Sequence, residues 1–184
     1  MDRLITIEEI KNARAALPPA IRETPILPFA ADSPSVGEEK LYLKAENLQV
    51  TGAYKVRAAF TILNGLTASE RKRGVVLTSS GNFAQAFGFA GAQMGVPIVV
   101  VMLDQTSPYK IEATRAYGAE VVFSGNDALA RQPFVEQIAA ERSMTPIDTW
   151  EDQRGTRGHA SIGLEILEQM PDVKTVLVPV SSGG

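Results

Sequence analysis

Residues 51–60 contain a lysine at a position where its amine could do chemistry. A Thr-Gly turn at residues 51–52 leads into apolar residues at helical spacing, and Lys55 falls in the first turn of the predicted helix. A cation there opposes the helix dipole, which favours the neutral amine that a nucleophile requires. The alternative is an ordinary solvated lysine, which is the commoner case on position alone.

A second candidate lies in the Thr-Ser-Ser-Gly-Asn-Phe-Ala-Gln segment at residues 78–85, between a predicted strand and a predicted helix. Hydroxyl groups, an amide and the free N–H groups of the helix start converge there. Such a turn can bind an anion such as a substrate carboxylate, and Gly81 would let the backbone approach a ligand closely. An ordinary helix cap is the alternative.

A third candidate is the final Ser-Ser-Gly-Gly at residues 181–184, which follows an apolar segment. After a strand, this composition is typical of a phosphate cradle made of backbone N–H groups. The chain contains no GxGxxG or Walker pattern, so the usual dinucleotide and nucleoside-triphosphate sites are not indicated.

Residue counts exclude several function classes. The 184 residues include no cysteine and one histidine, His159, so zinc fingers, cysteine nucleophiles and multi-histidine metal centres are excluded and no metal site is expected. A net charge of −3 argues against nucleic-acid binding. The longest apolar run, residues 96–103, is too short to span a membrane and predicts a buried strand. His159 is interpreted as structural and Trp150 as a packing or interface residue; a cytoplasmic setting is expected.

The elements that must position these candidates alternate along the middle of the chain. Short β-branched runs and helical periods follow one another, which predicts a parallel sheet covered by helices. The predicted strands are residues 74–78, 98–103 and 119–123, and the predicted helices are residues 82–94, 107–118 and 127–142.

The flanking regions predict further elements. Thr6 and Glu9 stand at capping-box spacing before a helix, and residues 41–46 alternate as a half-buried strand would. A composition shift at residues 145–157 indicates a boundary, and a helix at about 159–170 and a strand at 173–180 follow. Because the chain stops in what looks like a strand-to-helix turn, we expect it to be truncated, with a partner segment missing.

Together the three candidate segments resemble the fold-type II pyridoxal-phosphate enzymes, in the branch of the threonine/serine dehydratases and serine racemases. K-A-E-N-L-Q-V-T-G-A-Y-K-V-R at residues 44–57 resembles that branch's "K-x-E-N-x-Q-x-T-G-S-F-K-x-R" signature. S-S-G-N-F-A-Q at 79–85 is similar to its "S-x-G-N-H-A-Q" loop, and residues 110–122 follow its next helix and strand. Cysteine synthases usually carry "S-G-N-T-G" at this loop and fit less well.

The resemblance implies an α/β fold of open, mostly parallel twisted sheets with helices on both faces, and pyridoxal 5'-phosphate as cofactor. It also implies a complete small α/β domain over residues 74–149 and an incomplete large domain over 1–73 and 150–184. Lys55 would form the Schiff base and move the Cα proton, and Asn82 would bond the ring hydroxyl of the cofactor. Ser79 and the loop amides would bind the substrate carboxylate, and Ser80 would be the acid/base on the opposite face. The implied cofactor-binding residues are Lys55, Tyr54, Asn82, Ser181, Ser182, Gly183 and Gly184, and the substrate-binding residues are Ser79, Ser80, Gly81, Phe83 and Gln85.

This sequence departs from the family pattern at several positions. Tyr54 replaces the phenylalanine beside the lysine, and Phe83 stands where the family usually has histidine, which removes a polar contact near the substrate. Ser181 and Ser182 replace the first two glycines of the phosphate loop, while Gly183 and Gly184 match its later part.

The resemblance implies an ammonia-lyase (dehydratase) that converts L-threonine or L-serine-like hydroxy-amino acids to a 2-keto acid and ammonia. An amino-acid (serine) racemase on the same scaffold is the first alternative, favoured by Ser80. A catalytically silent fragment or pseudo-enzyme is the second, favoured by Phe83 and by the end of the chain at Gly184. The expected partners are an amino-acid substrate and a second copy of the chain in a homodimer, with no nucleic acid and no membrane.

Overall fold

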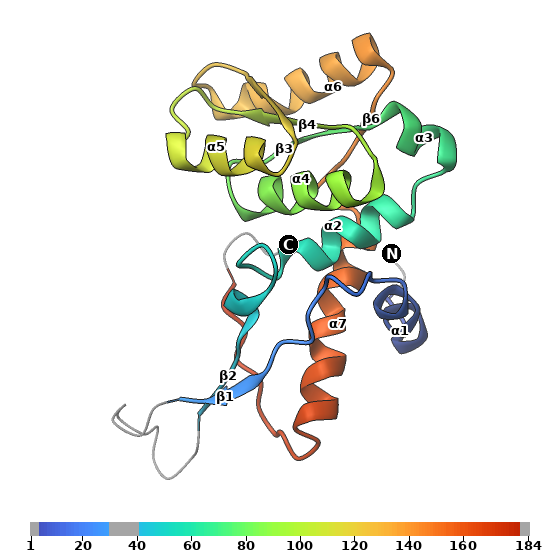
Figure 1. Cartoon of the computed structure of the whole chain (residues 1–184), viewed down its shortest axis with the longest axis vertical. Helices are drawn as coiled ribbons and strands as arrows, with labels where there is room; N and C mark the ends of the chain where they lie inside the picture. The colour runs from blue at the N-terminus through green and yellow to red at the C-terminus, as the bar shows by residue number, and fades with distance from the viewer. Residues whose placement is uncertain (1–3, 30–40, 181–184) are drawn as a thin grey trace.

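The computed structural model describes residues 4–29 and 41–180, and its central feature is a parallel sheet (Figure 1). The strand order is β5-β4-β3-β6, and every pairing in this sheet is parallel. The strands are β3 (Val75–Thr78), β4 (Ile98–Met102), β5 (Glu120–Phe123) and β6 (Thr145–Pro146). Because parallel strands share one direction, the carboxyl ends of β3, β4 and β6 lie at one edge of the sheet.

Helices cover both faces of this sheet, as the alternating sequence pattern predicts. Helices α4 (Asn82–Met94) and α5 (Pro108–Ala116) lie on one face, and α6 (Arg131–Arg142) lies on the other (Figure 1). Successive strand residues divide between two buried clusters, so that Leu77 packs toward α4 and Val76 packs toward α6. The expected α/β fold class is confirmed.

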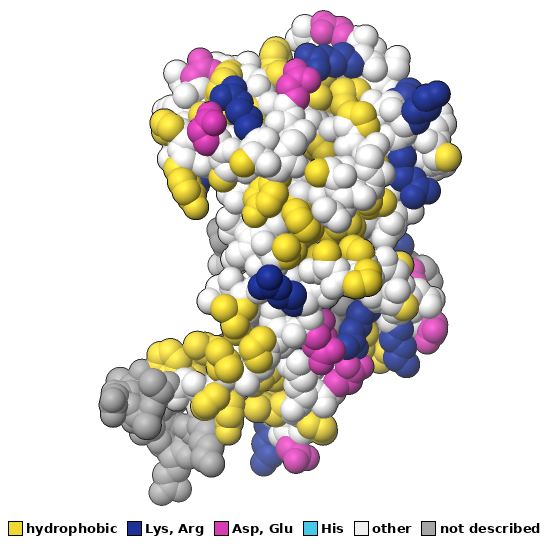
Figure 2. Space-filling model, in the orientation of Figure 1, with side chains coloured by type: hydrophobic (Ala, Val, Ile, Leu, Met, Phe, Trp, Pro, Cys, Tyr) yellow, Lys and Arg dark blue, Asp and Glu magenta, His cyan; other side chains and the backbone are white. Residues whose placement is uncertain are grey.

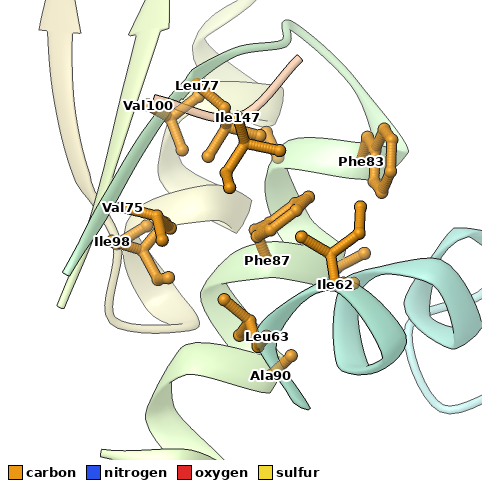
Figure 3. Packing of buried hydrophobic residues seen from close by; sticks show 14 of the residues in the cluster. Ile62, Leu63, Val75, Leu77, Phe83, Phe87, Ala90, Ile98, Val100 and Ile147 are labelled. Carbon is orange, nitrogen blue, oxygen red and sulfur yellow. The ribbon is translucent and has the colours of Figure 1, made fainter. Parts of the chain in front are cut away.

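Helix α2 (Lys55–Asn64) joins this sheet layer to the rest of the chain. Ile62 and Leu63 of α2 pack against Phe87 and Ala90 of α4 in the larger cluster (Figure 3). The opposite side of α2 packs against α7 (Gln153–Gln169), which also contacts α1 (Ile7–Ala15). The other elements are β1 (Ile26–Pro28), β2 (Tyr42–Lys44), η1 (Glu46–Leu48), α3 (Ala68–Arg73) and η2 (Ala128–Ala130).

The ends of several elements differ from the sequence expectations. The capping box of Thr6 and Glu9 is confirmed. The helix expected at about 159–170 begins six residues earlier, at Gln153, because the Asp152 side chain accepts a hydrogen bond from the Arg154 N–H and caps it. Gly155 lies in its first turn, and glycine lowers helix propensity, so sequence periodicity did not reveal that turn.

Two strand expectations are wrong in part or in whole. The half-buried strand at 41–46 is a three-residue strand, β2, whose Leu43 is 47% exposed; hydrophobic side chains gather over β1 and β2 in Figure 2. The strand expected at 173–180 does not form, and its Leu177 is 79% exposed. No strand among the described residues pairs with residues 173–180, so the backbone of this segment makes no strand-to-strand hydrogen bonds with them.

The proposed division into domains, one over residues 1–73 with 150–184 and the other over residues 74–149, stays a prediction.

No helix within residues 4–29 and 41–180 is long and apolar enough to cross a membrane.

Candidate functional site

Lys55 is the first residue of α2, directly after the turn that the sequence indicates. Gly52 adopts a φ of +72°, a left-handed conformation that favours glycine, and Tyr54 is the N-cap residue. The half-buried Lys55 side chain extends between two aromatic rings. Its Nζ lies 4.8 Å from the ring centroid of Tyr54 and 5.0 Å from that of Phe83. The structure thus brings the lysine of the first candidate segment against the second candidate segment.

The second segment spans the end of β3, the loop of residues 79–81 and the start of α4, at the carboxyl edge of the sheet. The Oγ of Ser79 accepts a hydrogen bond from the backbone N–H of Ala84 at 3.2 Å, which ties the loop to the helix start. The Oγ of Ser80 accepts from the Oγ1 of Thr106 at 3.3 Å, across to the loop after β4. Each serine hydroxyl therefore keeps its own hydrogen for donation.

The α4 side of the site presents one backbone position that is open to a ligand. A Cβ built on Gly81, the residue before α4, would meet no other atom within 4 Å, so packing does not require glycine there. Asn82 is exposed and Gln85 is half-buried, while Phe83 is only 8% exposed. Open space beside Gly81 fits a loop that a ligand approaches closely.

The one histidine of the chain lies against both rings that flank Lys55. The His159 ring centroid is 4.8 Å from that of Tyr54 and 6.1 Å from that of Phe83. Burial, and then the charges of Lys55 and Arg57, lower the pKa of His159 to about 3. The imidazole is therefore neutral at physiological pH.

Four charged side chains form a buried ion cluster, defined by Lys44, Glu46, Arg57 and Glu165. The Arg57 side chain is fully buried; its Nη2 donates to Oε1 of Glu46 at 2.9 Å, and its Nη1 donates to Oε1 of Glu165 at 2.5 Å. Lys44 Nζ donates to Oε2 of Glu165 at 2.6 Å. The two cations balance the two carboxylates, as burial of charge requires.

This buried ion cluster fixes the first turn of α2, which carries Lys55. Burial alone would raise the pKa of Glu165, but the hydrogen bonds and charges of Arg57 and Lys44 hold it below its ordinary value. The carboxylate stays ionised and joins the middle of α7 to α2 and β2. Arg57 is two residues from Lys55, so the cluster sets the direction in which the lysine leaves the helix.

A glycine lets α7 approach α2 closely enough for these contacts. A Cβ on Gly158 would lie 2.7 Å from the Cα of Ala58 and 2.7 Å from the carbonyl oxygen of Arg57. Both atoms are backbone and cannot move aside. Gly158 therefore places its neighbour, His159, beside the start of α2.

The sequence matches a known family model over nearly its whole length. The model described as "Pyridoxal-phosphate dependent enzyme" matches residues 17–184. The chain belongs to this family of pyridoxal-phosphate-dependent enzymes.

Individual members of the family resemble the chain over about half of their own length. It is 34% identical over 181 residues to an L-threonine dehydratase catabolic TdcB of Staphylococcus aureus (strain USA300), covering 98% of this chain and 52% of that protein. Maize serine racemase superposes with a TM-score of 0.91 at 30% identity, covering 96% of this chain and 54% of that one. A threonine deaminase from T.th. gives a TM-score of 0.82 at 33% identity, covering 91% of this chain and 52% of that one.

The side chains described above fit the cofactor of this family. An amine at Lys55 Nζ can hold an aldehyde carbon, and the aromatic rings beside it can cover a flat ring. Open space at Gly81 is a further feature that a bound molecule would use. Within residues 4–29 and 41–180, no group of three or more His, Cys, Asp or Glu side chains could hold a metal ion.

Some expected site residues lie together, and others fall outside the described residues. Lys55, Tyr54 and Phe83 are in contact, and Ser79 and Ser80 lie in the loop directly before α4. Asn82 precedes Phe83 on α4, and Gln85 follows it by two residues. Four expected site residues lie outside the described part of the chain. They are those of the expected phosphate cradle, Ser181, Ser182, Gly183 and Gly184.

Sequence reasoning assigned His159 a structural role and did not single out Arg57. The available signal for His159 was the Gly-x-x-Gly spacing of Gly155 and Gly158, which predicts a close helix–helix approach just before it. Arg57 was noted only as the last residue of the motif at 44–57. Its pairing with Glu165 could not be predicted, because the two residues are 108 positions apart in the sequence.

Proposed function

We propose that this chain carries the lysine-bearing part of a pyridoxal-phosphate-dependent ammonia-lyase that acts on L-threonine or L-serine-like hydroxy-amino acids. The products would be a 2-keto acid and ammonia. The single observation that carries the proposal is the position of Lys55 Nζ, which lies over the rings of Tyr54 and Phe83. Phe83 follows the loop of residues 79–81 by two residues.

Each of these residues has a role that its chemistry supports. Lys55 would hold the cofactor at Nζ until the amine of the substrate takes its place, and the freed Lys55 amine would then take the Cα proton of the substrate. Pyridoxal phosphate, when bound, supplies an electron sink for the charge left at Cα. The Ser79 hydroxyl, whose oxygen already accepts from the Ala84 N–H, would donate its hydrogen to the substrate carboxylate together with the loop amides.

The other loop side chains would complete the site. Ser80 would hold or move a proton at Oγ on the face opposite Lys55, and Thr106 orients that oxygen by donating to it. The Asn82 amide would bond the ring hydroxyl of the cofactor. Gly81 would leave room for the substrate. Phe83 and Gln85 would border the substrate, and the phosphate group would be held through backbone and hydroxyl donors of Ser181, Ser182, Gly183 and Gly184.

An amino-acid racemase is the second candidate, and Ser80 is the observation that favours it. A racemase must return a proton to the face opposite the lysine, and a hydroxyl oriented by Thr106 suits that step. The likeness to maize serine racemase supports the same candidate.

The test is a titration of the purified chain with pyridoxal phosphate, followed by product analysis with L-threonine, L-serine and D-serine. We expect a visible absorption band from the bound cofactor and a 2-keto acid with ammonia from the L-amino acids. D-serine formed from L-serine would favour the racemase instead. Cofactor binding with no product from any of the three would favour a silent protein.

A matched control separates Lys55 from lysines in general. Lys110 also lies in the first turn of a helix, α5, and is exposed. We expect Lys55→Ala to lose the absorption band and Lys110→Ala to keep it. Equal bands in the two variants would refute the assignment of Lys55. A homodimer and a cytoplasmic setting stay predictions, and light scattering of the purified protein tests the first.

A further inference from the structure

His159 is a half-buried polar side chain that the proposed mechanism does not use. Its Nδ1 is buried and has no hydrogen-bond partner among the described residues. Polar atoms in protein interiors are usually paired, so an unpaired nitrogen bears on which of the two ring nitrogens carries the proton. No other histidine is present in the chain to share a role with it.

The position of the imidazole connects it to Lys55. The His159 ring and Lys55 Nζ lie against the same two aromatic rings, Tyr54 and Phe83, at separations between 4.8 and 6.1 Å. Three elements that are distant in sequence meet here, namely the start of α2, the start of α4 and the second turn of α7. The imidazole is therefore part of the wall around the lysine.

The charge state of the ring determines what it can offer to a ligand. Burial is the largest cause of the low pKa of His159, and the charges of Lys55 and Arg57 follow it. An unpaired buried N–H is rarer in proteins than an unpaired acceptor. We therefore assign the buried Nδ1 as the unprotonated nitrogen of the ring. The ring proton is then on Nε2, and the neutral ring presents one N–H donor.

We propose that His159 is a ligand-binding residue of the Lys55 site, whose neutral imidazole donates a hydrogen bond from Nε2 to an anionic oxygen of the bound molecule. The oxygen belongs either to the cofactor or to the carboxylate of the amino-acid substrate. A neutral donor binds that oxygen without adding a third cation beside Lys55 and Arg57. The inference rests on the proposed function, since it requires a ligand at Lys55.

The single histidine makes the test direct. Nitrogen-15 NMR of the labelled chain resolves one imidazole, whose two nitrogen shifts report both its tautomer and its protonation. Without ligand, we expect the Nε2–H tautomer and no protonation down to pH 5. Protonation near the ordinary histidine value, or the Nδ1–H tautomer, would overturn the inference.

Ligand addition distinguishes the source of the oxygen. If the cofactor is the partner, pyridoxal phosphate alone shifts the Nε2 signal; if the substrate carboxylate is the partner, the shift appears only after L-serine is added. A cofactor band at Lys55 with no change of the imidazole in either arm would overturn the inference and leave the proposed function intact. Absence of the cofactor band would refute the proposed function, and the inference would fall with it.

Two variants add an affinity readout. His159→Gln keeps an N–H donor and is expected to retain ligand affinity within about threefold, whereas His159→Phe removes the donor and is expected to lose about tenfold or more. Rescue by the donor-bearing variant separates binding from packing, because phenylalanine is the better match to the aromatic neighbours. Equal affinity of the two variants would contradict the inference.

Discussion

Acidification from pH 7 to pH 5 should destabilise the protein through His159. Burial, with the charges of Lys55 and Arg57, lowers the pKa of His159 from 6.5 in the unfolded chain to about 3 in the folded one. Between these values only the unfolded chain binds the proton. Protonation therefore stabilises the unfolded state, and folding stability falls as pH drops below 6.5.

The loss of unfolding free energy at a given pH follows from how far that pH lies from the folded and unfolded pKa values of His159. At pH 5 the unfolded imidazole is protonated and the folded one is not, and the difference amounts to about 2 kcal/mol of unfolding free energy. The stability that Glu165 contributes through its lowered pKa is present above the unfolded value of 4.5 and is lost only as pH falls further. Between pH 7 and pH 5, the change in unfolding free energy thus reports the titration of His159 and not that of Glu165.

Urea unfolding followed by circular dichroism measures this free energy at each pH. The matched variant is His159→Gln, which is polar and does not titrate. We expect the wild-type protein to lose about 2 kcal/mol more than His159→Gln between pH 7 and pH 5. The same loss in both proteins would refute the reasoning that this imidazole is held neutral by its surroundings.

Three further outcomes follow from the contacts around Lys55. Arg57→Met removes the central cation of the buried ion cluster and should lower the unfolding free energy by about 3–5 kcal/mol, which urea unfolding would detect as a lower midpoint. Gly158→Ala should be destabilising by about 1–3 kcal/mol because its Cβ meets backbone, whereas Gly163→Ala, whose Cβ meets nothing within 4 Å, should be neutral or stabilising in thermal melts. Ser80→Ala should reduce turnover by about 10²–10⁴-fold and Thr106→Val by up to about tenfold in product assays, and equal turnover in the two variants would contradict their assigned roles.

The sheet and its covering helices could be predicted because their signals are local. Residues 74–123 alternate between β-branched runs and helical periods, and glycine or proline marks most of their ends. The structure confirms β3, α4, β4, α5 and β5 in that order. The segment at 173–180 misled the same reasoning, because an apolar run says nothing about whether a neighbouring strand is present to pair with it.

The site was predicted only as far as its residues lie in short motifs. Lys55 and residues 79–85 could be singled out as candidates because each motif is continuous in the sequence. The contact of His159 with Tyr54 could not be predicted, since it depends on how α7 packs on α2. The pairing of Arg57 with Glu165 likewise depends on a tertiary contact across 108 residues.

Borohydride reduction of the chain with pyridoxal phosphate, followed by peptide mass mapping, tests the central claim most directly. Reduction fixes the cofactor to whichever amine holds it. The proposed function predicts a phosphopyridoxyl group on the peptide that contains Lys55, and none at any site in Lys55→Ala. Modification spread over other lysines, or none at Lys55 in a folded chain, would contradict it.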